Sequence, residues 1–229
     1  MNREKVLFIE DEAALAEIVK ESLEAKGFEV CHAPTVSRAM LLYRQHTPAI
    51  IIADVMLPDG NGFEFIQELR KTDTLTPVIF LTSRSQTDDV VKGFELGGND
   101  YLKKPFSIAE LVVRMKSLLR KDNSPVPKLA EAHTWVFGTF SFHYPAGELQ
   151  NGKQKKQLTS READLLHLLL LNRNEALQRN YLLQTLWGNT DYFSGRSLDV
   201  FISKLRKYLG ADSTVKIINV RGIGYKMIY

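Results

Sequence analysis

The sequence predicts an α/β domain, built on a five-stranded doubly wound parallel sheet, followed by a smaller α+β domain. In residues 5–121, short apolar runs alternate five times with segments of helical periodicity, which is the pattern of repeated βα units. After residue 133 the pattern changes to an alternating segment, three helical segments and a final apolar hairpin. We therefore expect domains at 1–121 and 134–229, joined by a linker at 122–133.

Each strand of the first domain is expected to be short, apolar and followed by a helix. The third apolar run reads Ala-Ile-Ile-Ile-Ala, which is typical of a strand buried on both faces of a parallel sheet. Gly27 marks the end of the first helix. The expected strands are 5–9, 28–33, 49–53, 77–81 and 100–102, and the expected helices are 12–26, 36–46, 63–71, 87–96 and 107–121.

The second domain begins after a change in composition. Two prolines and small polar residues in 121–128 interrupt the periodicity and indicate a linker. Residues 135–144 then alternate as in a strand, and Asn151-Gly152 is a hairpin turn signal. Helices are expected near 160–171, 179–187 and 195–209, and a closing hairpin is expected over 216–220 and 225–229.

The composition is that of a globular protein, with 44% hydrophobic and 25% charged residues in a chain of 229. Cys31 is the only cysteine, so no intrachain disulfide can form, and a reducing compartment fits best. The apolar run at the start of the chain is too short for a signal peptide, and no run is long enough to cross a bilayer. We therefore expect a cytoplasmic protein with no membrane insertion.

Charge is distributed unevenly between the two domains. Residues 1–121 contain 16 Lys and Arg against 18 Asp and Glu, whereas residues 122–229 contain 14 against 9. A polyanionic partner is therefore expected at the second domain only.

Polar side chains follow four of the predicted strands. In an open parallel sheet these positions share the carboxyl edge, where ligands bind. Three carboxylates at that edge would raise one another's pKa unless a cation compensates them, and their hard oxygen atoms suit Mg²⁺. The residues are Glu10-Asp11, Asp54, Thr82-Ser83 and Lys104-Pro105.

Asp54 is the candidate nucleophile at this edge. A carboxylate can attack a metal-bound phosphoryl group, while Thr82 donates a hydrogen bond to one phosphoryl oxygen and Lys104 neutralises another. The alternative is that these acids are solvated loop residues, which is the usual explanation for any one of them alone. Four suitable residue types at four strand ends favour a phosphoryl-accepting site.

These residues give the first domain its resemblance to the receiver domains of bacterial response regulators, whose fold is CheY-like and flavodoxin-like. The resemblance implies that Asp54 accepts a phosphoryl group from the phosphohistidine of a sensor histidine kinase. The motifs that carry it are Glu10-Asp11, Asp54-Val-Met-Leu-Pro58-Asp-Gly60, Leu81-Thr82-Ser83, Asp100-Tyr101 and Lys104-Pro105-Phe106.

The resemblance also assigns roles around Asp54. It implies that Asp11, Asp54 and the backbone carbonyl of Met56 bind Mg²⁺, with Glu10 assisting through water. It further implies that the hydroxyl of Thr82 moves to the phosphate while the ring of Tyr101 turns inward, as a switch pair. A cis peptide bond is implied between Lys104 and Pro105.

A phosphatase of the haloacid-dehalogenase type uses similar groups and is the chemical alternative. Such enzymes place a second aspartate two residues after the nucleophile, where it protonates the leaving group. Here that position is Met56, which carries no proton to give. Turnover as a phosphatase is therefore disfavoured, and we expect a phosphoacceptor that assists its own phosphotransfer rather than an enzyme.

The last predicted helix, residues 195–209, is apolar on one face and mainly basic on the other. Such a helix suits the DNA major groove, although a solvated charged face is the common alternative. The expected core positions are Leu198, Ile202, Leu205 and Leu209, and the expected outer positions are Arg196, Asp199, Val200, Ser203, Lys204 and Lys207, with Arg206 at the edge.

Residues 134–229 resemble the winged helix-turn-helix output domain of the OmpR/PhoB family. The resemblance implies that Lys204 and its neighbours read bases, that Arg196 and Arg206 hold phosphates, and that Arg221 enters the minor groove. RNA binding by stacked aromatic side chains is a weaker alternative. The motifs are Leu158-Thr159-Ser160-Arg-Glu162, Leu182-Leu183-x-x-Leu186-Trp187, Arg196-Ser-Leu-Asp199-Val-Phe-Ile202-Ser-Lys204-Leu-Arg206-Lys and Val220-Arg221-Gly222-Ile-Gly224-Tyr225, and the expected DNA contacts are Arg196, Ser197, Asp199, Val200, Ser203, Lys204, Arg206, Lys207 and Arg221.

The two resemblances together predict a two-component response regulator that controls transcription. Its expected partners are a sensor histidine kinase, double-stranded promoter DNA, RNA polymerase and, when phosphorylated, a second copy of itself. Two alternatives stay open: a regulator of the same fold that needs no phosphate, and a protein-interaction module that does not bind DNA.

The dimer interface is expected on the fourth helix, fifth strand and fifth helix of the receiver. By resemblance, Asp100 would pair with Arg114 across that interface. The family usually has a cation where Val90 stands, facing Glu110, and an aspartate where Asn99 stands. Glu110 therefore has no obvious salt-bridge partner in the sequence.

Overall fold

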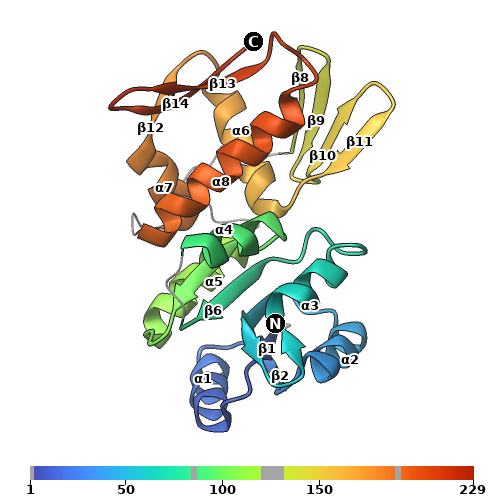
Figure 1. Ribbon diagram of the computed structural model, residues 1–229, viewed down its shortest axis with the longest axis vertical. Helices are drawn as coiled ribbons and strands as arrows, with labels where there is room; N and C mark the ends of the chain where they lie inside the picture. The colour runs from blue at the N-terminus through green and yellow to red at the C-terminus, as the bar shows by residue number, and fades with distance from the viewer. Residues whose placement is uncertain (1–2, 84–86, 120–131, 189–191) are drawn as a thin grey trace. The chain divides into compact units, whose positions relative to one another are not determined.

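The computed structural model describes residues 3–83, 87–119, 132–188 and 192–229 (Figure 1). The chain divides into two compact units, Met1–Leu119 and Arg120–Tyr229, and each is described by itself. Residues 122–131 of the expected linker lie outside the described residues. Among the residues described, no helix is long and apolar enough to cross a membrane.

The first unit contains a five-stranded parallel sheet with the strand order β2-β1-β3-β6-β7. The chain leaves β1 in one direction for β2 and crosses back for β3, so the winding direction reverses at this point. This is the doubly wound sheet that the sequence predicts. Its strands are β1 (Lys5–Ile9), β2 (Glu29–Ala33), β3 (Ile50–Asp54), β6 (Val78–Thr82) and β7 (Asp100–Lys103).

Helices cover both faces of this sheet. Helix α1 contacts α5 on one side, and α2 contacts α3 on the other (Figure 1). The apolar side chains of α1 and α5 form one buried cluster with those of β1 and β3. The helices are α1 (Ala13–Ala25), α2 (Val36–His46), α3 (Gly62–Leu69), α4 (Thr87–Glu95) and α5 (Ile108–Leu119).

A small antiparallel ladder follows β3. The two-residue strands β4 (Met56–Leu57) and β5 (Gly60–Asn61) pair with each other, so the chain turns tightly at Pro58 and Asp59. Helix α3 then begins directly at Gly62. A methyl group built on this glycine would lie 2.2 Å from the carbonyl oxygen of Asp54, so only glycine lets the turn close against β3.

The second unit begins with an antiparallel sheet in the order β11-β10-β9-β8. A second sheet, in the order β12-β14-β13, contains the closing hairpin that the sequence predicts. The strands are β8 (His133–Phe137), β9 (Phe140–Tyr144), β10 (Glu148–Asn151), β11 (Gln154–Gln157), β12 (Ala176–Gln178), β13 (Lys216–Val220) and β14 (Gly224–Ile228).

Three helices pack between these sheets. They are α6 (Ser160–Leu171), α7 (Arg179–Trp187) and α8 (Tyr192–Leu209). Helix α8 contacts α6, α7 and β13, so it is held on several sides. It begins before Gly195, the predicted start, and Gly195 lies inside the helix. Strand β12 was not predicted, because three residues carry too little pattern to be seen.

Asp212 joins two turns of the second unit. One carboxylate oxygen accepts from the backbone N–H of Thr139 at 2.8 Å, and the other accepts from the N–H and hydroxyl of Thr214 at 2.9 and 2.6 Å. The hydrogen bonds from Thr214, followed by the one from Thr139, lower the pKa of Asp212 to about 2. The charged form of this side chain is therefore the form that stabilises the fold.

We expect Asp212→Ala to lower the melting temperature at pH 7. A carboxyl group whose pKa is lowered by folding stabilises the protein above its ordinary value of 3.8 and loses that contribution as the pH falls towards about 2. In denaturant titrations, the difference in the free energy of unfolding between wild type and Asp212→Ala should therefore shrink as the pH falls from 5 to 2.5. A difference that stays constant over this range would show that the ionised carboxylate is not the source of the effect.

Candidate functional site

Three carboxylates converge at the carboxyl edge of the parallel sheet. Glu10 and Asp11 follow β1 and Asp54 ends β3, and one oxygen from each lies within 4.8 Å of the others. Glu10 and Asp54 are buried, whereas Asp11 is exposed. They line a cavity of about 440 Å³ together with Met56, Ser83, Lys104 and neighbouring backbone.

The ammonium group of Lys104 bridges two of these carboxylates. Its Nζ lies 2.7 Å from an oxygen of Glu10 and 2.5 Å from an oxygen of Asp54. The lysine is held in place because its backbone N–H donates to the carbonyl of Thr82 at 2.8 Å. The Lys104–Pro105 peptide bond is cis, which confirms the prediction.

The charges in the cavity shift the pKa of two groups. Burial raises the pKa of Glu10 above its ordinary value, and the charge of Asp54 adds to that rise, although Lys104 opposes it. Burial lowers the pKa of Lys104, but the hydrogen bonds to Asp54 and Glu10 outweigh burial and hold the pKa above its ordinary value. Lys104 is therefore a cation at neutral pH, placed between two acids.

The phosphoacceptor candidate has a fixed orientation. One oxygen of Asp54 accepts from the backbone N–H of Met56 at 3.0 Å, while the other contacts Lys104. The side chain of Asp54 is only 10% exposed. Its carboxylate is thus held towards the cavity by backbone on one side and by an ammonium group on the other.

The predicted switch residues lie behind the cavity. Thr82 is buried at the end of β6. The ring of Tyr101 is fully buried, with its centroid 5.3 Å from the rings of both Phe80 and Phe94. Gly93 leaves room for it, because a methyl group built there would lie 2.4 Å from the Tyr101 hydroxyl oxygen. The ring of Tyr101 therefore points inward in this structure, which is the orientation that the resemblance associates with switching.

The oxygen donors fit a hard divalent cation. Mg²⁺ prefers carboxylate and carbonyl oxygens and keeps some of its waters, and Asp11 borders the open side of the cavity. The buried acid Glu10 is already compensated by Lys104. The residues present are thus consistent with a magnesium site formed by Asp11 and Asp54.

The predicted dimer residues pair within the chain. Arg114 Nη1 lies 3.0 Å from an oxygen of Asp100, and Nη2 lies 2.7 Å from an oxygen of Glu110. The expectation that Glu110 has no salt-bridge partner is wrong, because Arg114 lies one helical turn further along α5. Asn99 is buried, and its side-chain oxygen accepts from the backbone N–H of Val78 at 2.9 Å.

Helix α8 presents a polar face to solvent. Arg196, Ser203, Arg206 and Lys207 are exposed, as the sequence predicts. Leu198, Ile202, Leu205 and Leu209 are buried, as is also predicted. This exposed face follows the three- and four-residue spacing of a helix.

Three of the expected DNA contacts do not lie on that exposed face. Ser197 and Val200 are buried, and the side chain of Lys204 is 16% exposed, with its Nζ 2.5 Å from an oxygen of Glu162 on α6. Tyr208, one turn beyond Lys204, donates to the same carboxylate at 3.2 Å. The outer-face prediction for Val200 and Lys204 is wrong, because their row of α8, which continues to Tyr208, faces α6.

Ser197 belongs to another buried row of the helix. Phe201, one turn after it, packs against Trp187 of α7 with ring centroids 5.9 Å apart. Because α6 and α7 both pack on α8, the buried arc is wider than the four leucine and isoleucine positions alone indicate. The expectation that Ser197 contacts DNA is not supported by its position in this structure.

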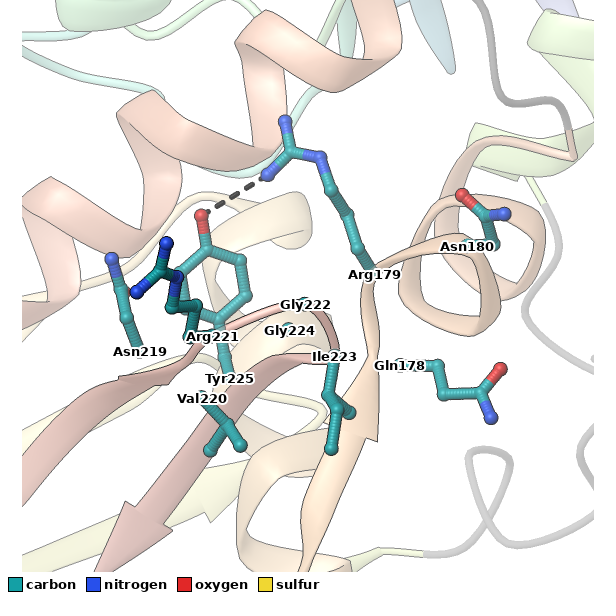
Figure 2. A pocket seen from close by; sticks show the side chains of 10 residues that line it. All are labelled: Gln178, Arg179, Asn180, Asn219, Val220, Arg221, Gly222, Ile223, Gly224 and Tyr225. Atoms are coloured by element: carbon teal, nitrogen blue, oxygen red, sulfur yellow. Dashed lines mark hydrogen bonds between the residues drawn. The ribbon is translucent and has the colours of Figure 1, made fainter.

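The hairpin of β13 and β14 carries Arg221 at its exposed tip, followed by Gly222 with φ of +75°. Beside it lies an open cavity of about 710 Å³, where Gln178 and Asn180 flank the start of α7 (Figure 2). Phe140 and Phe142 of β9 are buried, so these rings pack inside the second unit and do not form a base-stacking surface.

Comparisons with known proteins agree with both units. Residues 6–116 match the family model described as the response regulator receiver domain, and residues 153–227 match the model described as transcriptional regulatory protein, C terminal. The transcriptional regulatory protein RprY of Bacteroides fragilis is 37% identical over 224 residues, covering 98% of this chain and 94% of RprY. TrcR of Mycobacterium tuberculosis is 36% identical, covering 97% of this chain and 86% of TrcR.

Solved structures show the same architecture. The response regulator DrrB of Thermotoga maritima, described as an OmpR/PhoB homolog, aligns over 100% of both chains with a TM-score of 0.53 and 26% identity. A RitR mutant aligns over 98% of both chains with a TM-score of 0.75, and at 24% identity it supports the fold alone. The chain belongs to the OmpR/PhoB family of response regulators, with a receiver domain followed by a winged-helix DNA-binding domain.

We expect Asp11→Asn to weaken Mg²⁺ binding at least about tenfold. Even a mutation in a residue that only hydrogen-bonds to a metal ligand lowers metal affinity by about tenfold or more. Isothermal titration calorimetry of the full chain measures the affinity. Glu64→Gln, which neutralises an exposed acid on α3, is the matched control and should bind like wild type. Equal weakening in both variants would mean that Asp11 acts only through general charge.

Proposed function

We propose that this protein is a phosphorylation-dependent transcriptional regulator of a two-component system. A sensor histidine kinase phosphorylates Asp54, the receiver dimerises, and the winged-helix domain binds promoter DNA. The observation that carries the proposal is the bridge from Lys104 to both Asp54 and Glu10, which presents one oriented carboxylate in an acidic cavity. We place the protein in the cytoplasm, with RNA polymerase as a further partner.

The chemistry follows from the groups around Asp54. A carboxylate oxygen of Asp54 attacks phosphorus while the P–N bond of the phosphohistidine breaks and the imidazole leaves with its electron pair. Lys104 then neutralises one phosphoryl oxygen, and the hydroxyl of Thr82 donates to another. Asp11, Asp54 and the carbonyl of Met56 would hold Mg²⁺, which supplies charge neutralisation for the transferred group.

Dimerisation is proposed through the face of α4, β7 and α5. Arg114 is paired with Asp100 and Glu110 inside the chain, so forming an intermolecular pair requires an exchange of partners rather than a new charge contact. Arg114 and Asp100 are both buried, so separating them would leave uncompensated buried charge at a cost of about 3–5 kcal/mol unless new partners replace the old ones. The phosphoryl group must therefore bias the exchange through the packing around Tyr101.

A second candidate is a regulator of the same family that binds DNA without phosphate. The observation in its favour is the inward ring of Tyr101, which is fully buried and packs against Phe80 and Phe94. An inward ring is the arrangement that the resemblance associates with the active receiver.

We expect beryllofluoride with Mg²⁺ to convert the protein from monomer to dimer in light scattering, and Mg²⁺ alone to leave it monomeric. Beryllofluoride occupies the position of the phosphoryl group on Asp54, so Asp54→Ala should abolish the shift. A dimer already present with Mg²⁺ alone, and unchanged in Asp54→Ala, would favour the phosphate-independent candidate.

We expect Lys207→Ala and Arg221→Ala each to weaken duplex DNA binding by about tenfold, because both are exposed cations on the proposed DNA face. Binding is measured by fluorescence anisotropy on a duplex that the wild-type protein has selected from a random-sequence pool. Lys26→Ala, which removes an exposed cation from the receiver, is the control. Equal affinity in all four proteins would leave the interaction-module alternative as the better explanation.

A further inference from the structure

Three elements of the second unit meet at the guanidinium group of Arg179, the first residue of α7. Its two terminal nitrogens donate to the two carboxylate oxygens of Asp199 on α8, at 2.5 and 3.0 Å. One of them also donates to the hydroxyl oxygen of Tyr225 on β14 at 3.1 Å, a bond drawn in Figure 2. The other donates to the carbonyl of Gly195 at 2.6 Å.

The hydroxyl group of Tyr225 closes this network. It donates to an oxygen of Asp199 at 2.7 Å, so the hairpin of β13 and β14 is bonded directly to α8. Tyr225 is buried, with 8% of its surface exposed, and its hydroxyl is engaged by Asp199 and Arg179. We call the contact between Asp199 and Tyr225 the first tether.

A second contact ties α8 to the same hairpin. Nε of Arg206 donates to the carbonyl of Ile217 at 2.8 Å, and Nη2 donates to the side-chain oxygen of Asn219 at 2.7 Å. Both acceptors lie on β13. We call this contact the second tether.

The two tethers lie on one side of the helix. Asp199 and Arg206 are seven residues apart, which is two turns, so both side chains point towards the hairpin. Lys207, the next residue after Arg206, is exposed and belongs to the solvent face. The charges of Asp199 and Arg206 are engaged by partners inside the unit, although both residues are DNA contacts in the sequence-based prediction.

We propose that Asp199 and Arg206 are positioning residues that fix the hairpin and its tip, Arg221, relative to α8. DNA is then contacted by the exposed side of α8 and by Arg221, at a separation that the two tethers set. A mobile hairpin would lose conformational entropy when it binds DNA, which would weaken binding. A hairpin held by the two tethers is already ordered before DNA binds.

The protonation state of Asp199 agrees with this role. Burial raises the pKa of Asp199, but the hydrogen bonds from Arg179 and Tyr225 outweigh burial and hold the pKa below its ordinary value. The carboxylate is therefore charged at neutral pH. An ionised carboxylate beside DNA phosphates would be repelled, and Arg179 compensates it within the protein.

The inference rests on the proposed DNA binding and is tested by double-mutant cycles on the full chain with beryllofluoride and Mg²⁺. The probe is the duplex selected by the wild-type protein. Arg221→Ala is combined in turn with Tyr225→Phe, which removes one tether without a charge change, with Arg206→Ala, and with Lys207→Ala. The last two are neighbouring cations on α8, so they form a matched pair.

We expect Arg221→Ala to weaken binding about tenfold in the wild-type and Lys207→Ala proteins, and less than about twofold in the Tyr225→Phe and Arg206→Ala proteins. A hairpin that has lost one tether still pairs with β12, but its tip is less well placed, so most of the contact of Arg221 is lost before the arginine is removed. Melting temperatures are also measured for every variant. If Tyr225 and Arg206 only stabilise the fold, their replacement lowers the melting temperature but leaves the effect of Arg221→Ala on DNA affinity unchanged.

An equal loss from Arg221→Ala in all four backgrounds would overturn the inference and leave DNA binding intact. A wild-type protein whose affinity is unchanged by both Arg221→Ala and Lys207→Ala would overturn the proposed DNA surface, and the inference with it. The two failures are therefore distinguishable.

Discussion

The contact of Lys104 with Glu10 and Asp54 is the interaction on which the receiver edge depends. Strands β1 and β3 are neighbours in the sheet, and each delivers an acid to the same edge. Without a cation, two buried carboxylates at this separation would raise each other's pKa and one would take up a proton. The ammonium group, placed by β7 on the far side of β6, lets both acids share one cavity.

The burial of the parallel sheet explains where the polar residues of the receiver stand in the sequence. A parallel sheet buried on both faces leaves only the strand ends free for polar side chains, so the chemistry gathers where β1, β3, β6 and β7 stop. Gly62 permits the tight return to α3 and thereby sets the direction of the Asp54 backbone. The cavity is thus a consequence of the topology, and the particular residues at the strand ends decide what it binds.

In the second unit, the corresponding constraint is the packing of α8. The helix is in contact with α6, with α7 and with the hairpin, and a different row of its side chains packs against each of them. Lys204 is committed to α6 through Glu162, and Arg206 is committed to β13. Ser203 and Lys207 stay exposed on the solvent face. In the proposed arrangement, hydrogen bonds between α8 and the hairpin set the position of this face relative to Arg221.

Much of this could be predicted from the sequence, because the periodicity of βα units and the polar residues at strand ends are local signals. The five-stranded doubly wound sheet and the apolar core of α8 followed from such signals. The partner of Lys204 did not, since a helical wheel shows which side a residue faces but not which acid lies opposite. Asp100 was expected to pair with Arg114 across a dimer rather than within the chain, and the four-residue spacing of Glu110 and Arg114 was a local signal that was missed. The role of Arg179 was also missed, although a lone arginine opening a helix two residues after an apolar strand position is a signal that could be looked for.

The most direct test is mass spectrometry of the full chain after incubation with Mg²⁺ and a small phosphoryl donor such as phosphoramidate. The account predicts the gain of one phosphoryl group on Asp54, lost in Asp54→Ala and strongly reduced when Mg²⁺ is removed or Lys104 is replaced by alanine. A chain that gains no phosphoryl group, or gains it equally in Asp54→Ala, would contradict the claim that this cavity accepts phosphate.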